Sequence, residues 1–443
     1  MNKPKNENYA ATVVEINTLI DLENCDNVQH ANIFGNLVIV SKDIKPDDIG
    51  LFFPIETQLS EEYLSANNLY RDATLNQDQT QKGYFEKNGR IRAMKFRGHK
   101  SMGLFMPLSS LTFTGQSIDS LKVGDTFDEL NGKEICRKYI IKQQVTPGKG
   151  QNKKGKQWEK VSVLIDNQFH FHVDTAQLGR NIHKIKPDTL IHVTRKIHGK
   201  SFISSNILCK KKLSAWDKIG KFIGMDIKET EYQNIYSSRR VVKNDTMNLP
   251  KNHYYSIDIW GKANEKVKDI LTEGMTVYGE IVGYIDESKM IQKGYDYGCK
   301  PGEFEIYIYR ITYTSPSGHV FEYSAKQVQQ WCKLNGLQAV EEYYFGRAID
   351  IFHWIEEDYS VEYDDSLPFQ ENLLNYLQEK YLEKEAHDCV HKVPDEGIVL
   401  RIEDSLDIDP YKLKSFSFYE YETKMLDKGE EDIETGSDEQ EES

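Results

Sequence analysis

The chain has 443 residues and a formal net charge of −14; 39% of its residues are hydrophobic and 28% are charged. This is the composition of a globular protein, and the length predicts two or three domains. No stretch approaches the roughly 18 consecutive apolar residues of a membrane helix, and the start MNKPKNENYA lacks the apolar segment of a signal peptide. These features argue against a membrane protein, and we expect a soluble, cytoplasmic one.

The negative charge is concentrated at the carboxyl end. Residues 429–443 contain eight acidic residues and neither Lys nor Arg, so the net charge of the remaining chain is −14 plus 8, or −6. We expect 428–443 to be a disordered acidic tail, because such a segment has too little apolar surface to fold. The total charge therefore does not exclude an anionic partner, which would contact a local basic surface.

Residues 1–8 are expected to be a short tail, and residues 9–138 a small β domain. Runs such as ATVVEI, GLFFPI and GLFMPL recur there, separated by clusters of Gly, Pro, Asn and Asp. A five-stranded OB barrel fits this pattern, as do other small barrels. One basic run is either a nucleic-acid surface or an exposed charged strand. Its residues are Arg90, Arg92, Lys95, Arg97 and Lys100.

A basic linker is expected over 139–160, where Gly and Lys are frequent and apolar residues rare. The spacing of Gly150, Gly155 and Lys156 matches most of a phosphate-binding P-loop. That loop needs Ser or Thr at the next position, whereas this chain has Gln157, and no helical pattern follows. The segment therefore fits a linker better than a nucleotide site.

Residues 161–427 are expected to form one larger α+β domain. Strand-like runs include LIHVTRKI, TVYGEIVGYI, EFEIYIYRITY, EGIVLRI and YKLKSFSFYEYE. The stretch TAQLGRNIHKI and most of 324–386 have apolar residues at helical spacing, which predicts a largely helical insert over 324–386. The run NQFHFHVD alternates like a strand, which argues against a metal site at His170 and His172.

Five charged residues in this domain occupy unusual places. Glu280 follows a glycine inside an apolar run, and Glu396 begins another. A buried carboxylate is costly without a partner or a metal. Lys412 and Lys414 face one side of a strand, and Lys196 follows the run LIHVTR. Each has an ordinary alternative: a glutamate paired with a structural Arg, two solvated lysines, or a surface lysine before a turn.

In this order, the motifs KIHG, YGEIVG, EGIVL and KLK resemble those of the covalent nucleotidyltransferases, which are the RNA ligases, DNA ligases and mRNA-capping enzymes. His198, where Asp is common, resembles the RNA-ligase branch. Ser238-Arg239 resembles the Ser-Arg element after the nucleophile, and Tyr309 resembles the aromatic residue that stacks on adenine. The amino-terminal half is similar to the OB module of the Deinococcus-type RNA ligases, so the resemblance spans 10–425.

This resemblance implies an ATP-dependent RNA ligase that joins 3′-OH and 5′-phosphate ends at nicks through a lysyl-AMP and an RNA-adenylate. The implied fold is an amino-terminal OB-fold barrel followed by a nucleotidyltransferase domain of antiparallel sheets with flanking helices. The implied cofactors are ATP and Mg²⁺ or Mn²⁺. The implied partner is RNA, as a nicked duplex with an RNA 3′-OH strand, bound by a monomer in RNA repair.

The resemblance also assigns roles to residues. Lys196 is the expected nucleophile, and no contact to ATP is expected upstream of residue 161. The catalytic set is Lys196, His198, Glu280, Glu396, Lys412 and Lys414. The ATP-binding set is Lys196, Gly199, Arg239, Glu280, Tyr309, Glu396, Lys412 and Lys414. The expected metal ligands are Glu280 and Glu396.

Three departures and alternatives remain at this stage. Arg195 and Ser201 stand where many RNA ligases have Glu and Asn. A capping guanylyltransferase or a DNA ligase is the nearest alternative, although both usually carry Asp at the position of His198 and place the OB domain after the catalytic one. A non-catalytic nucleic-acid-binding protein on a ligase fold is a second alternative, against which the intact charged set argues.

Overall fold

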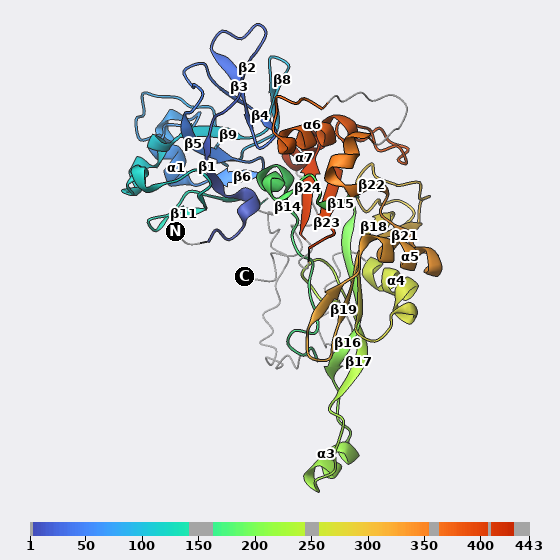
Figure 1. The fold of residues 1–443 in the computed structure, drawn as a ribbon. Helices are drawn as coiled ribbons and strands as arrows, with labels where there is room; N and C mark the ends of the chain where they lie inside the picture. Colours follow the sequence, from blue (N-terminus) through green and yellow to red (C-terminus); the bar gives the residue numbers. More distant parts are fainter. Residues whose placement is uncertain (1–2, 141–162, 244–256, 354–362, 406–408, 429–443) are drawn as a thin grey trace.

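The computed structural model describes residues 3–140, 163–243, 257–353, 363–405 and 409–428. Figure 1 shows two parts, an amino-terminal part (3–140) and a larger carboxy-terminal part that holds the rest of the described chain. The P-loop-like window, most of the expected linker and the acidic tail lie outside the described residues.

The amino-terminal part is built from short strands, as its alternating sequence predicts. Its larger sheets have the orders β10-β1-β5-β9 and β2-β3-β4, beside the pairs β13-β6, β7-β8 and β11-β12. The strands are β1 (Ala11–Glu15), β2 (Leu19–Asp21), β3 (Val28–Ile33), β4 (Asn36–Ser41), β5 (Ile49–Phe53), β6 (Thr57–Leu59), β7 (Met94–Phe96), β8 (His99–Ser101), β9 (Leu104–Pro107), β10 (Thr126–Phe127), β11 (Glu129–Leu130), β12 (Lys133–Glu134) and β13 (Cys136–Lys138). Helix α1 (Glu61–Ala66) begins where the Ser60 side chain accepts a hydrogen bond from the Tyr63 N–H. These described strands form no single closed ladder, so the OB barrel stays a prediction.

The carboxy-terminal part contains two sheets whose strands are mostly antiparallel, as expected. The first has the order β14-β24-β23-β15-β22 and the second β17-β16-β18-β19-β20, with β21 beside β19. The first consists of β14 (Ala176–Gln177), β15 (Leu190–Arg195), β22 (Glu342–Arg347), β23 (Gly397–Ile402) and β24 (Pro410–Lys414). The second consists of β16 (Lys200–Lys210), β17 (Thr230–Ser237), β18 (Met275–Gly283), β19 (Phe304–Thr314), β20 (Val320–Glu322) and β21 (Gln338–Ala339). The chain crosses from the first sheet to the second between β15 and β16, which is where Lys196 lies.

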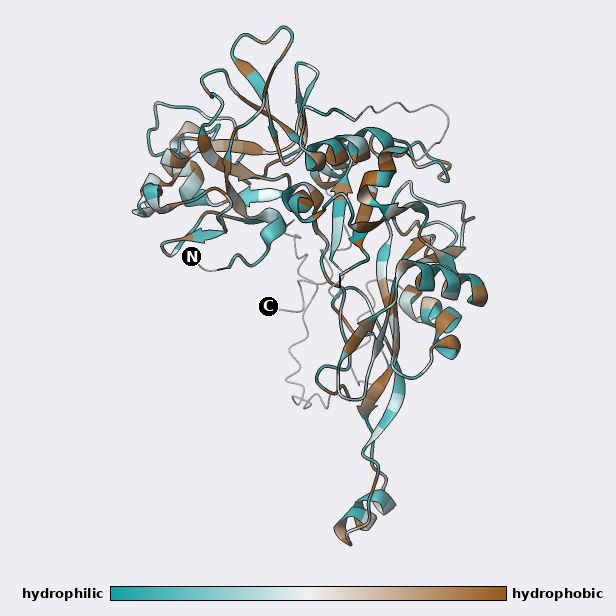
Figure 2. Cartoon of the chain, in the orientation of Figure 1, coloured by the Kyte–Doolittle hydropathy of each residue, from teal (hydrophilic) through white to brown (hydrophobic). Residues whose placement is uncertain are grey.

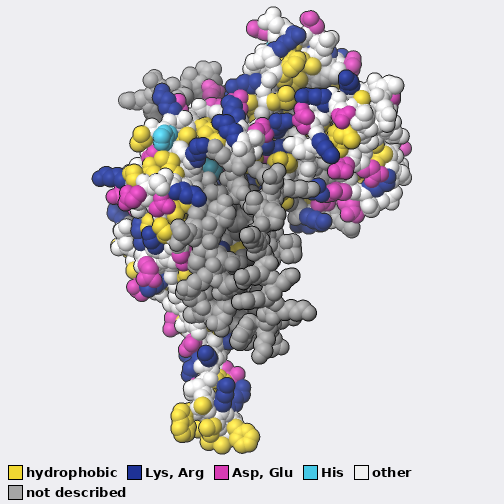
Figure 3. All heavy atoms as spheres, turned by 180° about the vertical axis from the view of Figure 1, so that it is seen from behind, with side chains coloured by type: hydrophobic (Ala, Val, Ile, Leu, Met, Phe, Trp, Pro, Cys, Tyr) yellow, Lys and Arg dark blue, Asp and Glu magenta, His cyan; other side chains and the backbone are white. Residues whose placement is uncertain are grey.

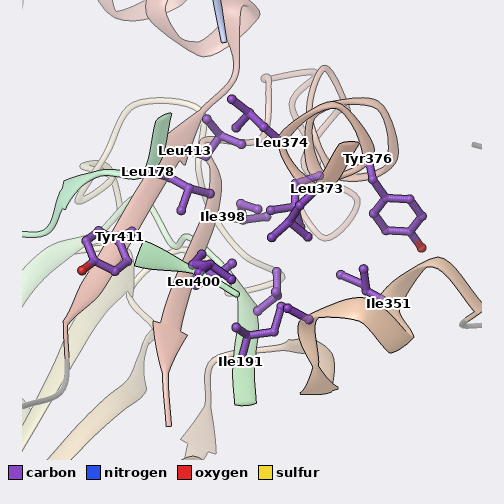
Figure 4. Close-up of a cluster of buried hydrophobic side chains, with 14 of the residues drawn as sticks. Leu178, Ile191, Ile351, Leu373, Leu374, Tyr376, Ile398, Leu400, Tyr411 and Leu413 are labelled. Atoms are coloured by element: carbon purple, nitrogen blue, oxygen red, sulfur yellow. The ribbon is translucent and has the colours of Figure 1, made fainter. Parts of the chain in front are cut away.

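Helices cover one face of each sheet. Helix α6 (Phe369–Tyr381) packs Leu373 against Ile398 of β23, in one buried cluster (Figure 4). Helices α4 (Ile259–Val267) and α5 (Ala325–Asn335) add side chains to a second cluster around β18 and β19. Burying one such aliphatic side chain contributes about 1.5–3 kcal/mol. The two clusters therefore hold both flanks of the Lys196 crossover.

Three expectations about secondary structure are wrong. The segment 342–347 is strand β22, because Gly336 ends α5 in a left-handed conformation and the aromatic-rich EYYFGR pairs with β15. Residues 416–427 form helix α7 (Phe416–Asp427), which Ser415 caps by accepting from the Phe418 N–H. The segment NQFHFHVD is not a strand. In all three segments, the spacing of apolar residues predicted one secondary structure, whereas caps and contacts with neighbouring elements stabilise another.

The two parts are joined through four of the five cations of the basic run, whose role as a nucleic-acid surface stays a prediction. Arg90 and Arg92 form ion pairs with Asp427 of α7, and the Arg90 side chain is fully buried. Lys95 pairs with Glu420, and Lys100 pairs with Glu383. Four cations of the run therefore contact the carboxy-terminal part, while Arg97 donates to the Asn24 backbone oxygen.

A long ribbon projects from the carboxy-terminal part. Strands β16 and β17 pair over eight residues each and carry helix α3 (Ala215–Phe222) at their far end (Figure 1). Within the described ranges, no helix of the chain is long and apolar enough to cross a lipid bilayer.

The contact between the two parts can be tested at Gly179 of helix α2 (Leu178–Asn181). A Cβ at this position would lie 1.9 Å from the backbone oxygen of Phe34. Gly179→Ala should therefore lower the thermal unfolding temperature by roughly 3 °C or more, since overpacking costs about 1–3 kcal/mol. The matched control is Gly220→Ala, where the nearest atom is the mobile Cδ1 of Ile227 at 3.1 Å. Equal melting curves for Gly179→Ala and the unmodified chain would contradict this close contact.

Candidate active site

A cavity of about 740 Å³ lies between the two parts. Seven of the predicted site residues line it: Lys196, Arg239, Glu280, Tyr309, Glu396, Lys412 and Lys414. Tyr9, Lys138 and Tyr139 of the amino-terminal part also line it. Both parts therefore form walls of the cavity, while the absence of a contact to ATP upstream of residue 161 stays a prediction.

Glu396 holds two of the predicted lysines at one oxygen. Its Oε1 lies 3.0 Å from Lys196 Nζ and 2.9 Å from Lys414 Nζ, and the Glu396 side chain is 3% exposed. Lys196 follows β15, Glu396 precedes β23 and Lys414 ends β24. Because these three strands are neighbours in the sheet, the three charged groups meet at the same edge.

The residues on either side of Lys196 hold its backbone in place. The Lys196 N–H donates to Gly397 O over 2.9 Å. The preceding Arg195 is buried; it donates from Nε to Asp395 (3.0 Å) and from both terminal nitrogens to Asp388 (2.8 and 2.9 Å). Sequence reasoning saw Arg195 as a departure from a family pattern and missed both aspartates. One signal was present, since Asp395 directly precedes the EGIVL motif.

Burial and neighbouring charges set the ionisation of this cluster. Burial raises the pKa of Glu396, but Lys196 and Lys414 outweigh that effect and bring it to about 2. Burial, followed by the charges of Lys414 and Lys196, lowers the pKa of Lys412 from 10.5 to about 7. Burial also opposes the charge of Lys414, yet Glu396 prevails and raises its pKa. The Glu396 carboxylate therefore stays ionised, while Lys412 is easily deprotonated.

Strands β18 and β19 bring a carboxylate and an aromatic ring to the cavity. Glu280 pairs with Ser201 in the ladder between β18 and β16. The register of β18 against β19 shifts between Tyr278 and Gly279, and Tyr309 is the extra residue at this bulge. A bulge changes the direction of a side chain locally, and Tyr309 is among the residues that line the cavity.

His198 and Gly199 do not line the cavity. Their contacts instead support the residues that do. The His198 ring packs edge-on against Tyr295 and Phe418, with ring centroids 4.8 and 5.0 Å away. A Cβ on Gly199 would lie 2.7 Å from the Ile281 backbone oxygen. Glycine thus lets β18 approach the loop that carries the nucleophile candidate.

The segment 169–174 supplies two partners that sequence reasoning did not assign. Asp174 forms an ion pair with Arg239, and His172 Nδ1 lies 2.8 Å from the Tyr309 hydroxyl. Tyr278 also donates from its hydroxyl to the His170 backbone oxygen over 3.1 Å. The segment crosses the second sheet and holds the groups expected to contact ribose and base.

The acidic groups fit a metal that arrives with a ligand. Within the part of the chain that the structure describes, no group of three or more His, Cys, Asp or Glu side chains is placed to hold a metal ion. Oε1 of Glu396 already contacts two ammonium groups. Mg²⁺ in phosphate-transfer sites needs one or two carboxylates, substrate phosphates and water. Glu280 and Glu396 suit that arrangement.

No protein-family model and no curated protein matches this chain. Solved structures of an RNA ligase from Naegleria gruberi do match it. The complex with pyrophosphate has a TM-score of 0.57 and 16% identity, covering 94% of this chain and 98% of that one. A variant with AMP and manganese gives 0.56 and 14%, covering 93% and 98%. A variant with ATP and manganese gives 0.55 and 14%, covering 94% and 99%. The chain therefore has the fold of these RNA ligases, across both of its parts.

Proposed function

We propose that this protein is an ATP-dependent RNA ligase that joins 3′-OH and 5′-phosphate ends through a lysyl-AMP. The observation that carries the proposal is Lys196 Nζ at a buried carboxylate, beside Lys412 and Lys414, in a cavity that also holds Glu280 and Tyr309. Structures of the same fold that contain ATP and manganese, AMP, or pyrophosphate support this nucleotide chemistry.

In the first step, Lys196 Nζ attacks the α-phosphorus of ATP. The nitrogen–phosphorus bond forms as the bond to the bridging oxygen breaks, and pyrophosphate leaves. The ammonium must first release a proton to solvent, because the nucleophile needs a lone pair. Glu396, with a pKa of about 2, is too weak a base to retain that proton, so its role is to position Nζ.

The remaining groups position the nucleotide. We assign Lys412 and Lys414 to the α-phosphate, Arg239 to the ribose, and Tyr309 to stacking on the base. A divalent ion bound with the triphosphate would neutralise phosphate charge, with Glu280 and Glu396 as its ligands. Because phosphoryl transfer depends mainly on position and charge, this set is sufficient for the chemistry.

Two further steps complete ligation. AMP moves from Lys196 to the RNA 5′-phosphate, and the 3′-OH then attacks that phosphate and releases AMP. The proposed substrate is a nicked duplex whose 3′-OH strand ends in RNA, bound by a monomer whose amino-terminal part is an OB-fold module. Arg137 and Lys138 support a contact between RNA and the amino-terminal part, because these two cations line the cavity from that part.

The assignment of the nucleophile is tested with Lys196→Ala. This variant should fold but form no nucleotide adduct that survives denaturation, since the alanine lacks the attacking nitrogen. The unmodified protein should be labelled by ATP in preference to GTP when each radiolabelled nucleotide is supplied with Mg²⁺. Lys186→Ala, which changes an exposed lysine, is the control. Normal labelling of Lys196→Ala would refute the assignment, and preferential labelling by GTP would favour a capping-type enzyme.

Lys412→Met should lower the activity of the protein and raise its thermal stability. With its pKa lowered to about 7, Lys412 binds fewer protons when folded than when unfolded between pH 7 and about 10.5. Its burial therefore destabilises the fold most at and below neutral pH, and stability recovers as pH rises. The variant should melt roughly 2 °C or more above the unmodified protein at pH 7, with the difference shrinking toward pH 10. Adduct formation should fall about a hundredfold. A lower melting temperature would show that Lys412 stabilises the fold.

The carboxylates are tested with Glu280→Gln and Glu396→Gln. Each should lose most sealing of pre-adenylated RNA, because glutamine keeps the shape but not the charge that holds a hydrated cation. Glu305→Gln, on the neighbouring strand β19, should seal normally. If either variant sealed at the rate of the unmodified protein, the role of that residue would be structural.

A further inference from the structure

The far end of the ribbon carries a cluster of exposed apolar side chains. Trp216 is 81% exposed and Phe222 is 91% exposed, and Ile219, Ile223 and Met225 are exposed beside them. Figure 2 shows hydrophobic colour on this helix, and Figure 3 shows the apolar side chains gathered at the extreme tip of the molecule. We call these five residues the apolar tip.

The helix that presents the apolar tip is well formed. The Ser214 side chain accepts from the Asp217 N–H (3.1 Å), and the Asp217 carboxylate accepts from the Ser214 N–H (2.9 Å), which is a capping box. On the inner side, the buried Gly220 faces Ile227. The local structure thus buries a small inner face and leaves the large side chains outside.

Lysines lie directly behind the apolar tip. Residues 210–229 contain six lysines and three acids, a net charge of +3 within a chain of −14. Ion pairs join Lys211 to Asp217 and Lys221 to Glu229. Figure 3 shows Lys and Arg side chains next to the apolar end, between it and the body of the protein. Along the ribbon, an apolar layer is therefore followed by a cationic layer.

This order of layers matches the surface of an anionic bilayer, where hydrocarbon lies beneath phosphate and carboxylate headgroups. Nucleic acid matches it less well, because Ile219, Ile223 and Met225 have no aromatic face for stacking on bases. A protein partner also fits poorly, since a helix of eight residues cannot bury the roughly 800 Å² per partner of a stable interface. We propose that residues 214–225 insert into the surface of an anionic lipid bilayer.

Docking in this way leaves the catalytic cavity accessible. Strand β16 has 11 residues, which corresponds to roughly 36 Å at about 3.3 Å per residue. The cavity adjoins the first residues of this strand and the apolar tip lies beyond its last. A membrane at the tip would therefore hold the active site away from the lipid and open to a large substrate.

The test is co-sedimentation of the full chain with vesicles of phosphatidylcholine alone or mixed with phosphatidylserine. We expect binding to the mixed vesicles and at least about tenfold weaker partitioning for Trp216→Ser/Phe222→Ser/Ile223→Ser. Lys210→Glu/Lys212→Glu/Lys218→Glu should weaken binding similarly. The control is Leu334→Ser/Val390→Ser, which removes two exposed apolar residues of the body and should bind normally. Thermal unfolding confirms that each variant is folded, independently of ligase activity.

Several outcomes would overturn the proposal. Failure of the unmodified chain to sediment with mixed vesicles would do so, as would normal binding by the triple serine variant. Equal binding to neutral vesicles would remove the role of the lysines. If the serine variant instead lost affinity for nicked RNA, or lost self-association, while vesicle binding was absent throughout, the tip would belong to RNA or to a second copy of the chain.

Discussion

The charged cluster at the cavity depends on the buried carboxylate of Glu396. Lys196, Lys412, Lys414 and Arg239 all line one cavity, and Glu396 contacts two of these cations at the same oxygen. Removing a charge from a buried pair leaves its partner uncompensated, which is strongly destabilising. Asp174 and Glu422 pair with two further members of the cluster, Arg239 and Lys414. These pairs fix the positions of the cations at the cavity wall before any ligand binds.

Helix α7 couples this cluster to the contact between the two parts. It begins directly after Lys414, and its Glu422 lies 3.8 Å from that lysine. Further along the helix, Glu420 and Asp427 bind the basic run of the amino-terminal part. A displacement of the amino-terminal part would therefore act on the same helix that follows β24, the strand of Lys412 and Lys414. The two parts line one cavity, although their cores are separate.

The strands that carry the motifs were predictable because their apolar runs are long and bounded by turns. Expectations for β15, β18, β19 and β23 are confirmed. Contacts between distant segments were not predictable from local pattern. The pairing of Arg195 with Asp388 joins residues almost two hundred positions apart. The position of Tyr9 at the cavity depends on how the two parts pack against each other. The helix at 416–427 was missed because the alternation in SFSFYEYE imitates a strand, while the cap at Ser415 decides the outcome.

The bulge at Tyr309 makes the length of β19 as important as its composition. Side chains alternate along a strand, so adding or deleting one residue exchanges the two faces of everything beyond that point. The extra residue at this bulge already changes the register once, between the end of the strand that packs on α5 and the end that pairs with β20. Substitutions within 304–314 can be absorbed one side chain at a time. An insertion or deletion there would exchange the buried and exposed faces of half the strand. Over evolutionary time this strand should therefore vary in sequence while its length stays constant.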